Sequence, residues 1–166
     1  MEYRDLYDEN RNLIGRRIRK TDKVPAGCYY NTVAVYIQNN KGDFLIQKRS
    51  PIKGGQWATT GGHPKSGEDS INGLCTEVKE EIGIDIDKAK LKLVKTIKTE
   101  DDFFDLYYIN MEVDLTNIVM QEAEVSDVKW ATADEIRNMI NNGTYKSSHG
   151  LMFEDCMKYL ENTLIK

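Results

Sequence analysis

Three glutamates, Glu77, Glu80 and Glu81, lie close together near the end of a predicted helix. Residues three and four positions apart share one side of a helix, where like charges repel, and the negative end of the helix dipole adds to that repulsion. A bound divalent cation reverses this local electrostatics. The pattern therefore predicts a cation site, and carboxylate ligands in this number favour Mg²⁺, with Mn²⁺ as the alternative.

The turn before these glutamates suits a phosphate ligand. Residues 59–63 read Thr-Thr-Gly-Gly-His, so they are polar and their glycine backbone can approach a ligand closely. Magnesium in proteins takes few carboxylate ligands and gains others from substrate phosphates. The turn and the carboxylates together indicate phosphate chemistry with metal activation of water.

The helix that carries the glutamates is predicted over residues 70–82. On a helical wheel its apolar residues form one stripe beside the glutamates, which predicts the face that packs on the core. The members of the stripe are Ile71, Leu74, Cys75, Val78 and Ile82. Ser66 or Asp69 is expected to cap the start of the helix, and Gly83 is expected to end it.

Residues 62–84, GHPKSGEDSINGLCTEVKEEIGI, resemble the Nudix box. That family's pattern is Gly, five residues, Glu, seven residues, and then Arg-Glu-apolar-x-Glu-Glu-x-Gly-apolar. The matching positions are Gly62, Glu68, Glu77, Val78, Glu80, Glu81, Gly83 and Ile84. Thr76 stands where the family has arginine, and this is the one departure among the defined positions.

The resemblance implies metal ligands and a general base. Relatives bind magnesium through the glutamates that match Glu77, Glu80 and Glu81, and often through the carbonyl that matches Gly62. One of these glutamates, with Glu77 or Glu81 favoured, is expected to activate the attacking water. The glutamate that matches Glu68 supports the site in relatives.

Further candidates come from the regions around the box. Glu100 and Asp102, in an acidic turn, are additional metal candidates, for which a solvated turn is the equal alternative. Arg49 and Lys53 are expected to hold substrate phosphates, since a guanidinium suits bidentate contact. His63 is a candidate substrate contact, with a structural hydrogen bond as the alternative.

The N-terminal residues 2–16 predict a strand, a turn and a second strand. This stretch resembles the isopentenyl-diphosphate-isomerase-like group of Nudix proteins, which contains hydrolases as well as isomerases. Residues 61–64, Gly-Gly-His-Pro, are similar to the isomerase's Cys-Gly-His-Pro, but Gly61 lacks the thiol that isomerisation requires. Hydrolysis is therefore the favoured chemistry.

The resemblance as a whole implies a magnesium-dependent pyrophosphohydrolase. Its substrate would be a small-molecule diphosphate, either a nucleoside diphosphate derivative or a related compound. An isopentenyl-diphosphate-isomerase-like enzyme and a non-catalytic Nudix-fold nucleotide-binding module remain as alternatives. A homodimer is one partner state that the resemblance implies, because dimers are common in the family.

The remaining elements give an α+β order. The predicted strands cover residues 31–38, 43–48, 91–99, 103–113 and 128–131, and the predicted helices cover 132–140 and 150–160. The first two strands are expected to form a hairpin. The order agrees with the α/β/α sandwich with a mixed central sheet that the resemblance implies. We expect a single Nudix domain over residues 1–166, with residues 1–27 as an N-terminal hairpin extension.

Composition agrees with a globular enzyme. The chain is 40% hydrophobic and 30% charged, and its net charge of −4 argues against general nucleic-acid binding. Three scattered cysteines favour reduced thiols and a cytoplasmic location. No apolar run in the sequence is long enough to cross a membrane.

Overall fold

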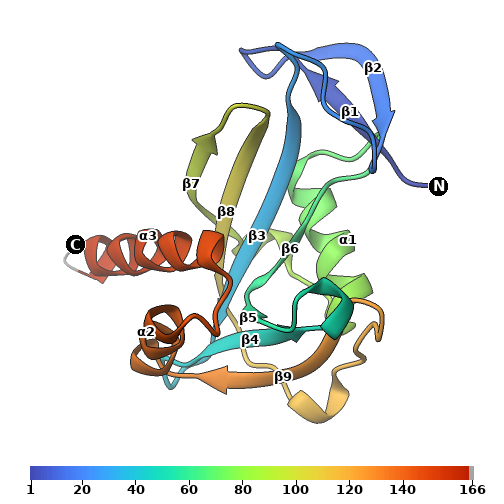
Figure 1. The fold of residues 1–166 in the computed structure, drawn as a ribbon. Helices are drawn as coiled ribbons and strands as arrows, with labels where there is room; N and C mark the ends of the chain where they lie inside the picture. Colours follow the sequence, from blue (N-terminus) through green and yellow to red (C-terminus); the bar gives the residue numbers. More distant parts are fainter. Residues whose placement is uncertain (165–166) are drawn as a thin grey trace.

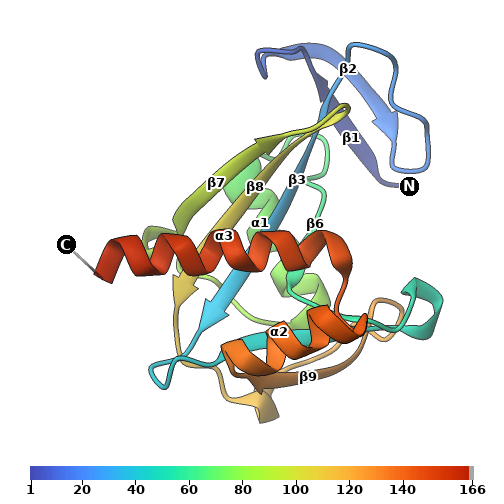
Figure 2. The same ribbon diagram turned by 60° about the vertical axis from the view of Figure 1, so that its left-hand side comes forward.

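The fold has three layers, which the computed structural model describes for residues 1–164. A seven-stranded sheet forms the middle layer. The helix α1 (Ser70–Ile82) covers one face of this sheet, and α2 (Ala133–Asn142) and α3 (Ser147–Leu164) cover the other face (Figures 1 and 2). The predicted α/β/α sandwich is confirmed.

The central sheet is mixed. Its strands are β3 (Tyr30–Gln38), β4 (Phe44–Arg49), β5 (Trp57–Ala58), β6 (Thr60–Gly62), β7 (Lys92–Lys98), β8 (Asp102–Asn110) and β9 (Val125–Ala131). The strands β3 and β8 run parallel along their full length, and the other neighbouring strands are antiparallel. Short 3₁₀ helices lie at Pro51–Lys53, Lys88–Lys90 and Leu115–Asn117.

The strand β3 is buried on both faces. Val33, Val35 and Ile37 belong to the core cluster that includes the apolar residues of α1. Ala34 and Tyr36 belong to the cluster that includes α2 and α3. Covering helices on both faces explain why this strand reads as a nearly continuous apolar run.

The predicted hairpin of residues 31–38 and 43–48 is only partly right. The strands β3 and β4 are antiparallel, but their register consists of the single pair Gln38 and Phe44. Further along, β6 takes the place beside β3, while β4 pairs with β5 and β9. A three-residue strand with two glycines has no strand signature, so its insertion could not be expected from the sequence pattern.

The helix α1 has the predicted bounds and caps. The Asp69 side chain accepts a hydrogen bond from the Asn72 backbone N–H at 2.8 Å. Gly83 ends the helix in the left-handed conformation, with φ at 73°. Most of the predicted stripe is buried, as Leu74, Val78 and Ile82 show, all of them fully inaccessible to solvent.

Two members of that stripe differ from the prediction. Ile71 is 36% exposed, and Cys75 is only partly buried. Cys75 lies at one edge of the stripe, whereas Ile71 lies near its middle but in the first turn of α1, so the contact with the sheet begins later along the helix than the wheel indicates.

The helix α2 begins after an N-cap at Thr132, whose hydroxyl accepts a hydrogen bond from the Glu135 backbone N–H at 3.1 Å. It ends two residues later than predicted, before Gly143. The helix α3 is longer than the predicted 150–160 at both ends. Its first residues, Ser147 and Ser148, are polar and carry no apolar periodicity, so the pattern placed the start too late.

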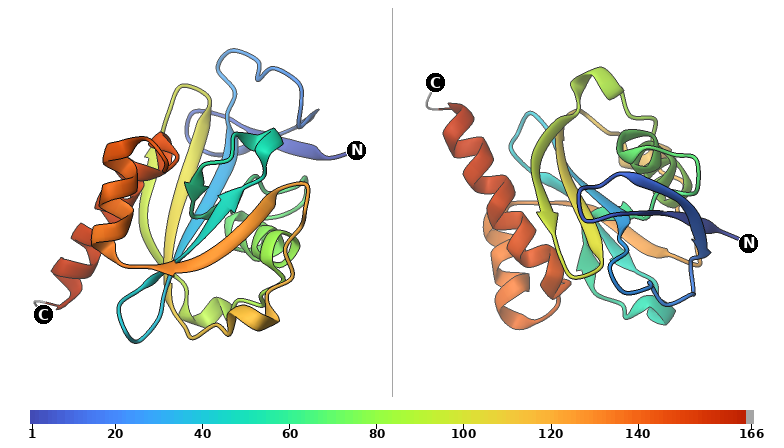
Figure 3. Two further views of the ribbon diagram at one scale, coloured as in Figure 1. Left: turned by 60° about the horizontal axis from the view of Figure 1, so that its bottom comes forward. Right: turned by 90° about the horizontal axis from the view of Figure 1, so that it is seen from above.

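The N-terminal hairpin forms its own two-stranded sheet, made of β1 (Tyr3–Tyr7) and β2 (Leu13–Arg19). It lies at the end of the central sheet where β3 begins (Figures 1 and 3). Arg11, in the turn of the hairpin, donates to both carboxylate oxygens of Asp105 in β8, at 3.0 and 2.6 Å. This partly buried ion pair fixes the hairpin against the central sheet. None of the described helices is long and apolar enough to cross a membrane.

Candidate active site

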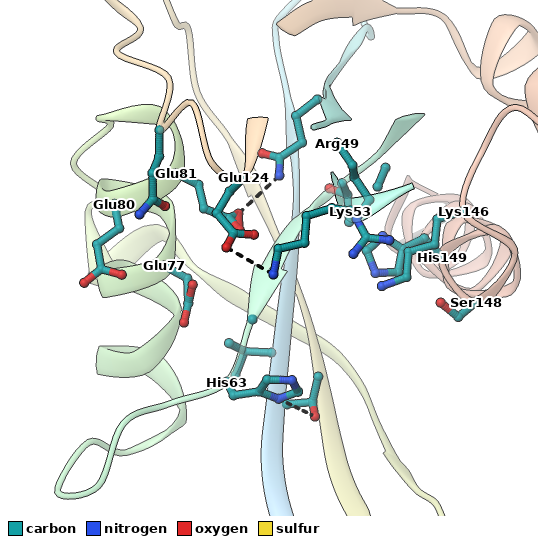
Figure 4. A pocket seen from close by; sticks show the side chains of 18 of the residues that line it. Arg49, Lys53, His63, Glu77, Glu80, Glu81, Glu124, Lys146, Ser148 and His149 are labelled. Carbon is teal, nitrogen blue, oxygen red and sulfur yellow. Dashed lines mark hydrogen bonds and ion pairs between the residues drawn. The ribbon is translucent and has the colours of Figure 1, made fainter. Parts of the chain in front are cut away.

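A cavity of about 240 Å³ brings together residues from α1, from the strands of the central sheet and from the start of α3 (Figure 4). Its charged and histidine lining residues are Glu2, Lys20, Arg49, Lys53, His63, Glu77, Glu80, Glu81, Glu124, Lys146 and His149. Gly62 also lines it. The structure thus brings all the main predicted site residues to one cavity.

The three glutamates of α1 form an acidic wall of this cavity. Glu77 and Glu81 are buried, with 9% and 7% of their surface exposed, while Glu80 is exposed. Burial raises the pKa of Glu77 to about 7; the positive charge of Lys20 opposes the shift, and the carboxylate of Glu80 adds to it. These are costly positions for carboxylates in the absence of a cation.

Glu81 has a hydrogen-bonded support. Burial raises its pKa to about 8, the Gln47 amide opposes the shift, and the charge of Glu77 adds to it. Gln47 Nε2 donates to Glu81 Oε2 at 3.2 Å, and the Thr60 hydroxyl donates to Gln47 Oε1 at 2.6 Å. These two hydrogen bonds, from Thr60 in β6 to Gln47 in β4 and from Gln47 to Glu81, therefore orient the Glu81 carboxylate.

Gly62 lies directly against Glu77. A Cβ built at Gly62 would be 2.5 and 2.7 Å from the two Glu77 carboxylate oxygens, closer than real Cβ contacts. The antiparallel pairing of Gly62 with Val33 holds this backbone in place. Only glycine allows the strand β6 to approach the acidic wall so closely.

The carboxylate oxygens of the acidic wall suit a divalent cation that prefers oxygen ligands. Glu77 and Glu81 make no ion pair within residues 1–164, so two buried carboxylates lack a compensating charge there. Across the same residues, no three acidic, histidine or cysteine side chains are grouped closely enough to hold an ion as they stand. Glu80 instead contacts the ammonium of Lys65. Glu80 lines the same cavity as the buried pair, so the cavity holds a third carboxylate.

Glu68 does not line the cavity. Its carboxylate accepts from the Lys65 backbone N–H at 2.8 Å and from the Thr76 hydroxyl at 2.5 Å. Glu68 therefore ties the preceding loop to α1. Thr76, which replaces the arginine of the family pattern, takes part in this tie.

The two candidates from the acidic turn also lie outside the cavity lining. Glu100 is exposed in the turn. Asp102 is buried, and it accepts a hydrogen bond from the Thr32 hydroxyl at 2.7 Å. The structure therefore does not bring Glu100 and Asp102 to the acidic wall.

His63 lines the cavity but carries no positive charge at neutral pH. Burial lowers its pKa to about 4, and the positive charges of Arg4 and Lys20 add to the shift. Its Nδ1 lies 3.2 Å from the Thr32 hydroxyl. A neutral His63 can exchange hydrogen bonds with a substrate, but it cannot neutralise a phosphate.

Arg49 and Lys53 line the cavity, and their contact with substrate phosphates stays a prediction. Lys53 pairs with Glu124, with 3.3 Å between Nζ and Oε1. Near Arg49 lie two residues that the sequence patterns did not single out as ligands, Lys146 and His149, which face the acidic wall from the start of α3 (Figure 4). They are distant from the box in sequence and reach the cavity only through packing of α3 against the sheet.

The sequence patterns also did not indicate Glu2, Lys20 and Gln47 as cavity residues. Glu2 and Lys20 flank the N-terminal hairpin, and only the docking of the hairpin brings them to the cavity. For Gln47 the sequence did offer an indication, because this polar residue directly follows the apolar residues that begin β4. In the structure Gln47 is only 5% exposed.

Comparisons with known proteins identify the family of the chain. The NUDIX domain profile matches residues 29–152. An uncharacterised Nudix hydrolase of Listeria monocytogenes is 33% identical over 149 residues, covering 87% of this chain and 88% of that relative. The chain belongs to the Nudix family, and it is an enzyme of the hydrolase type.

Two other similarities concern the branch and the fold. A protein of Photorhabdus laumondii named isopentenyl-diphosphate Delta-isomerase 2 is 27% identical over 165 residues, or 90% of this chain and 92% of that relative. The crystal structure of DR0079 from Deinococcus radiodurans superposes with a TM-score of 0.77 at 22% identity, covering 93% of this chain and 99% of that one. The first similarity agrees with the resemblance of the N-terminal region, and the second shows the fold.

Proposed function

We propose that the protein is a magnesium-dependent pyrophosphohydrolase that cleaves the diphosphate linkage of a nucleoside diphosphate derivative or a related small molecule. The observation that carries the proposal is the pair of buried carboxylates, Glu77 and Glu81, which share a cavity with Arg49 and Lys53 and lack a cationic partner within residues 1–164. An acidic wall facing a basic wall suits a metal–diphosphate complex, because each wall meets charge of the opposite sign.

The metal ligands come from α1 and β6. Glu77, Glu80, Glu81 and the Gly62 carbonyl would hold magnesium or manganese, with Glu68 as a support through its tie to Thr76. A bound ion would draw charge from the diphosphate and lower the pKa of water.

The reaction itself needs a base and phosphate ligands. Glu77 or Glu81 takes the proton of the attacking water, and Gln47 keeps Glu81 in position. Arg49 and Lys53 hold the phosphates. Water attacks one phosphorus atom, and the other phosphate leaves.

Isomerisation is the alternative chemistry, and the surroundings of Gly61 argue against it. A Cβ at Gly61 would lie 2.5 Å from the Val33 carbonyl oxygen, so this backbone has no room for a cysteine side chain. Cys28, Cys75 and Cys156 are not among the residues that line the cavity. Proton exchange from labelled water into isopentenyl diphosphate would support the isomerase.

A non-catalytic binding module is the other alternative. It would bind nucleotides without turnover, whatever metal is supplied. The intact set of Glu77, Glu80 and Glu81 favours an enzyme over such a module.

A substrate panel with a matched control tests the proposed function. Nucleoside diphosphates, nucleoside triphosphates and nucleotide sugars are incubated with Mg²⁺ or with EDTA, and released phosphate or monophosphate is measured. We expect metal-dependent release that falls at least about 100-fold in Glu81→Gln, since a general base contributes 10²–10⁴-fold. The control Glu161→Gln removes an exposed carboxylate of α3 and should keep full activity. Full activity in Glu81→Gln would refute the role given to Glu81.

We also propose that the chain acts as one Nudix domain in the cytoplasm. The three cysteines form no disulfide with one another, which suits a reducing compartment. The N-terminal hairpin is then part of the catalytic unit, because Glu2 and Lys20 line the cavity. A homodimer would agree with the family resemblance and can be checked by sedimentation.

A further inference from the structure

The wall opposite the glutamates holds two cations without a carboxylate partner. Arg49 and Lys146 line the cavity, and neither makes an ion pair with any residue of the described part of the chain. Lys53, by contrast, already has a carboxylate partner, because its ammonium lies 3.3 Å from Glu124 Oε1. Two partly buried like charges in one wall repel each other unless an anion lies between them.

His149 lies beside these cations, and its hydrogen-bonding capacity is unused. The residue is 8% exposed and its ring lines the cavity, but its buried Nδ1 has no hydrogen-bond partner in the described structure. A buried nitrogen without a hydrogen bond raises the free energy of the folded protein, because it has lost its contact with water. A small rotation of the ring toward a ligand in the cavity would relieve it.

The three side chains are electrostatically coupled. Burial lowers the pKa of His149 to about 3, and the charges of Lys146 and Arg49 add to the shift. Burial also lowers the pKa of Lys146; the charge of Arg49 adds to that shift, and the carboxylate of Glu81 opposes it. Arg49 and Lys146 therefore repel each other, and a bound anion would reduce that repulsion.

Backbone contacts fix this wall. The Lys146 backbone N–H donates to the Trp57 carbonyl at 2.8 Å, and the Trp57 N–H donates to the Thr144 carbonyl at 2.9 Å. These bonds join the start of α3 to β5, next to the strand that carries Arg49. The three side chains are thus held by ordered elements, with Ser148 beside them in the first turn of α3.

The cavity offers little to a nucleobase. Its aromatic lining is limited, among the described residues, to Phe104 and the two histidines His63 and His149. A phosphate suits the basic wall better, because arginine and lysine contact its oxygens through charge-assisted hydrogen bonds. A phosphate group therefore suits the wall opposite the glutamates better than a nucleobase does.

Building on the proposed hydrolysis, we propose that Arg49, Lys146 and His149 form a subsite for the free terminal phosphate of an organic diphosphate. A terminal phosphate carries about −1.5 to −2 charges near neutral pH, whereas a phosphate esterified on both sides carries about −1. The subsite therefore selects compounds that end in a free phosphate over diphosphates that are esterified at both ends, such as nucleotide sugars.

The test compares Lys146→Met with wild type on both classes of compound in the presence of Mg²⁺. We expect kcat/KM for compounds with a free terminal phosphate to fall about tenfold or more, mainly through KM, because a charge-assisted hydrogen bond is lost. The value for nucleotide sugars should change by less than about threefold. Lys146→Arg should restore most of the loss. Lys158→Met, which removes an exposed lysine of α3, should change the kcat/KM of neither class.

Equal losses for both classes, or no loss for either, would overturn the subsite. Thermal unfolding of each variant identifies any loss that comes from misfolding, in which case His149→Gln takes the place of Lys146→Met and must give the same selective loss.

A binding measurement separates this inference from the proposed function. Inorganic pyrophosphate is titrated calorimetrically into the protein in EDTA, where no hydrolysis occurs. Binding that weakens about tenfold in Lys146→Met supports the subsite even if the wild type cleaves nothing, whereas unchanged binding or none refutes it. Absence of turnover with every compound refutes the proposed function alone.

Discussion

Replacing Gly62 by alanine would force the backbone of β6 and the Glu77 carboxylate apart. The added Cβ would lie 2.5 and 2.7 Å from the two carboxylate oxygens, and Cβ contacts below 3.0 Å are essentially never seen. The pairing of Gly62 with Val33 holds the strand, whereas no hydrogen bond or ion pair within residues 1–164 holds the Glu77 side chain. Glu77 is therefore the group that moves.

The expected loss is much larger in activity than in stability. Crowding of this kind costs about 1–3 kcal/mol of folding free energy when nothing yields, and less when a side chain moves away. A displacement of about 1 Å in a catalytic group can lower the rate about 100-fold. Gly62→Ala should therefore lower kcat/KM about 100-fold while the protein stays folded.

The assay is a double-mutant cycle of kcat/KM with Gly62→Ala, Glu77→Gln and the double variant, each checked by thermal unfolding. Because both substitutions act through one carboxylate, the double variant should lose little more than the more damaging single variant. Wild-type kcat/KM in Gly62→Ala, or losses that simply multiply in the double variant, would refute the reasoning.

Two further substitutions test the packing that supports the site. Arg11→Met should cost about 3 kcal/mol at pH 7, because it leaves the buried Asp105 carboxylate without its ion pair. Burial acts to raise the pKa of Asp105, but the hydrogen bonds from Arg11, Ser70 and Thr96 outweigh it and leave the pKa lowered. The stabilisation is therefore complete above about pH 4 and is lost as the pH falls through the lowered value. Urea unfolding of wild type and variant from pH 7 to pH 3 measures it, and a difference that grows toward acid would contradict this account. Leu74→Ala, at a fully buried position of α1, should cost about 2–5 kcal/mol in the same assay, and a cost below about 1 kcal/mol would contradict the assigned core.

The parts of the fold that could be predicted are those with local causes. The start and end of α1 follow from Asp69 and Gly83, which act within a few residues of the helix ends. The apolar run of β3 reflects its burial between two helical layers. The glutamates of the box could be assigned to one cavity wall because they lie on the same helix.

What the sequence patterns missed depends on contacts between distant segments. The short strand β6 forms only because β3 offers it a partner. Lys146 and His149 reach the cavity through the packing of α3, and Lys20 reaches it through the docking of the hairpin. The acidic turn is the reverse case, because its residues were candidate metal ligands and do not line the cavity. Asp102 instead accepts a hydrogen bond from the Thr32 hydroxyl.

The central claim is that a divalent cation binds at the acidic wall of α1, and calorimetric titration of Mn²⁺ tests it most directly. Wild type and Glu161→Gln should bind the ion, with or without a pyrophosphate compound present. The variant that carries both Glu77→Gln and Glu81→Gln should bind at least about tenfold more weakly, because it lacks both buried carboxylates. Undiminished binding in that variant, or no binding to wild type even with pyrophosphate supplied, would contradict the claim.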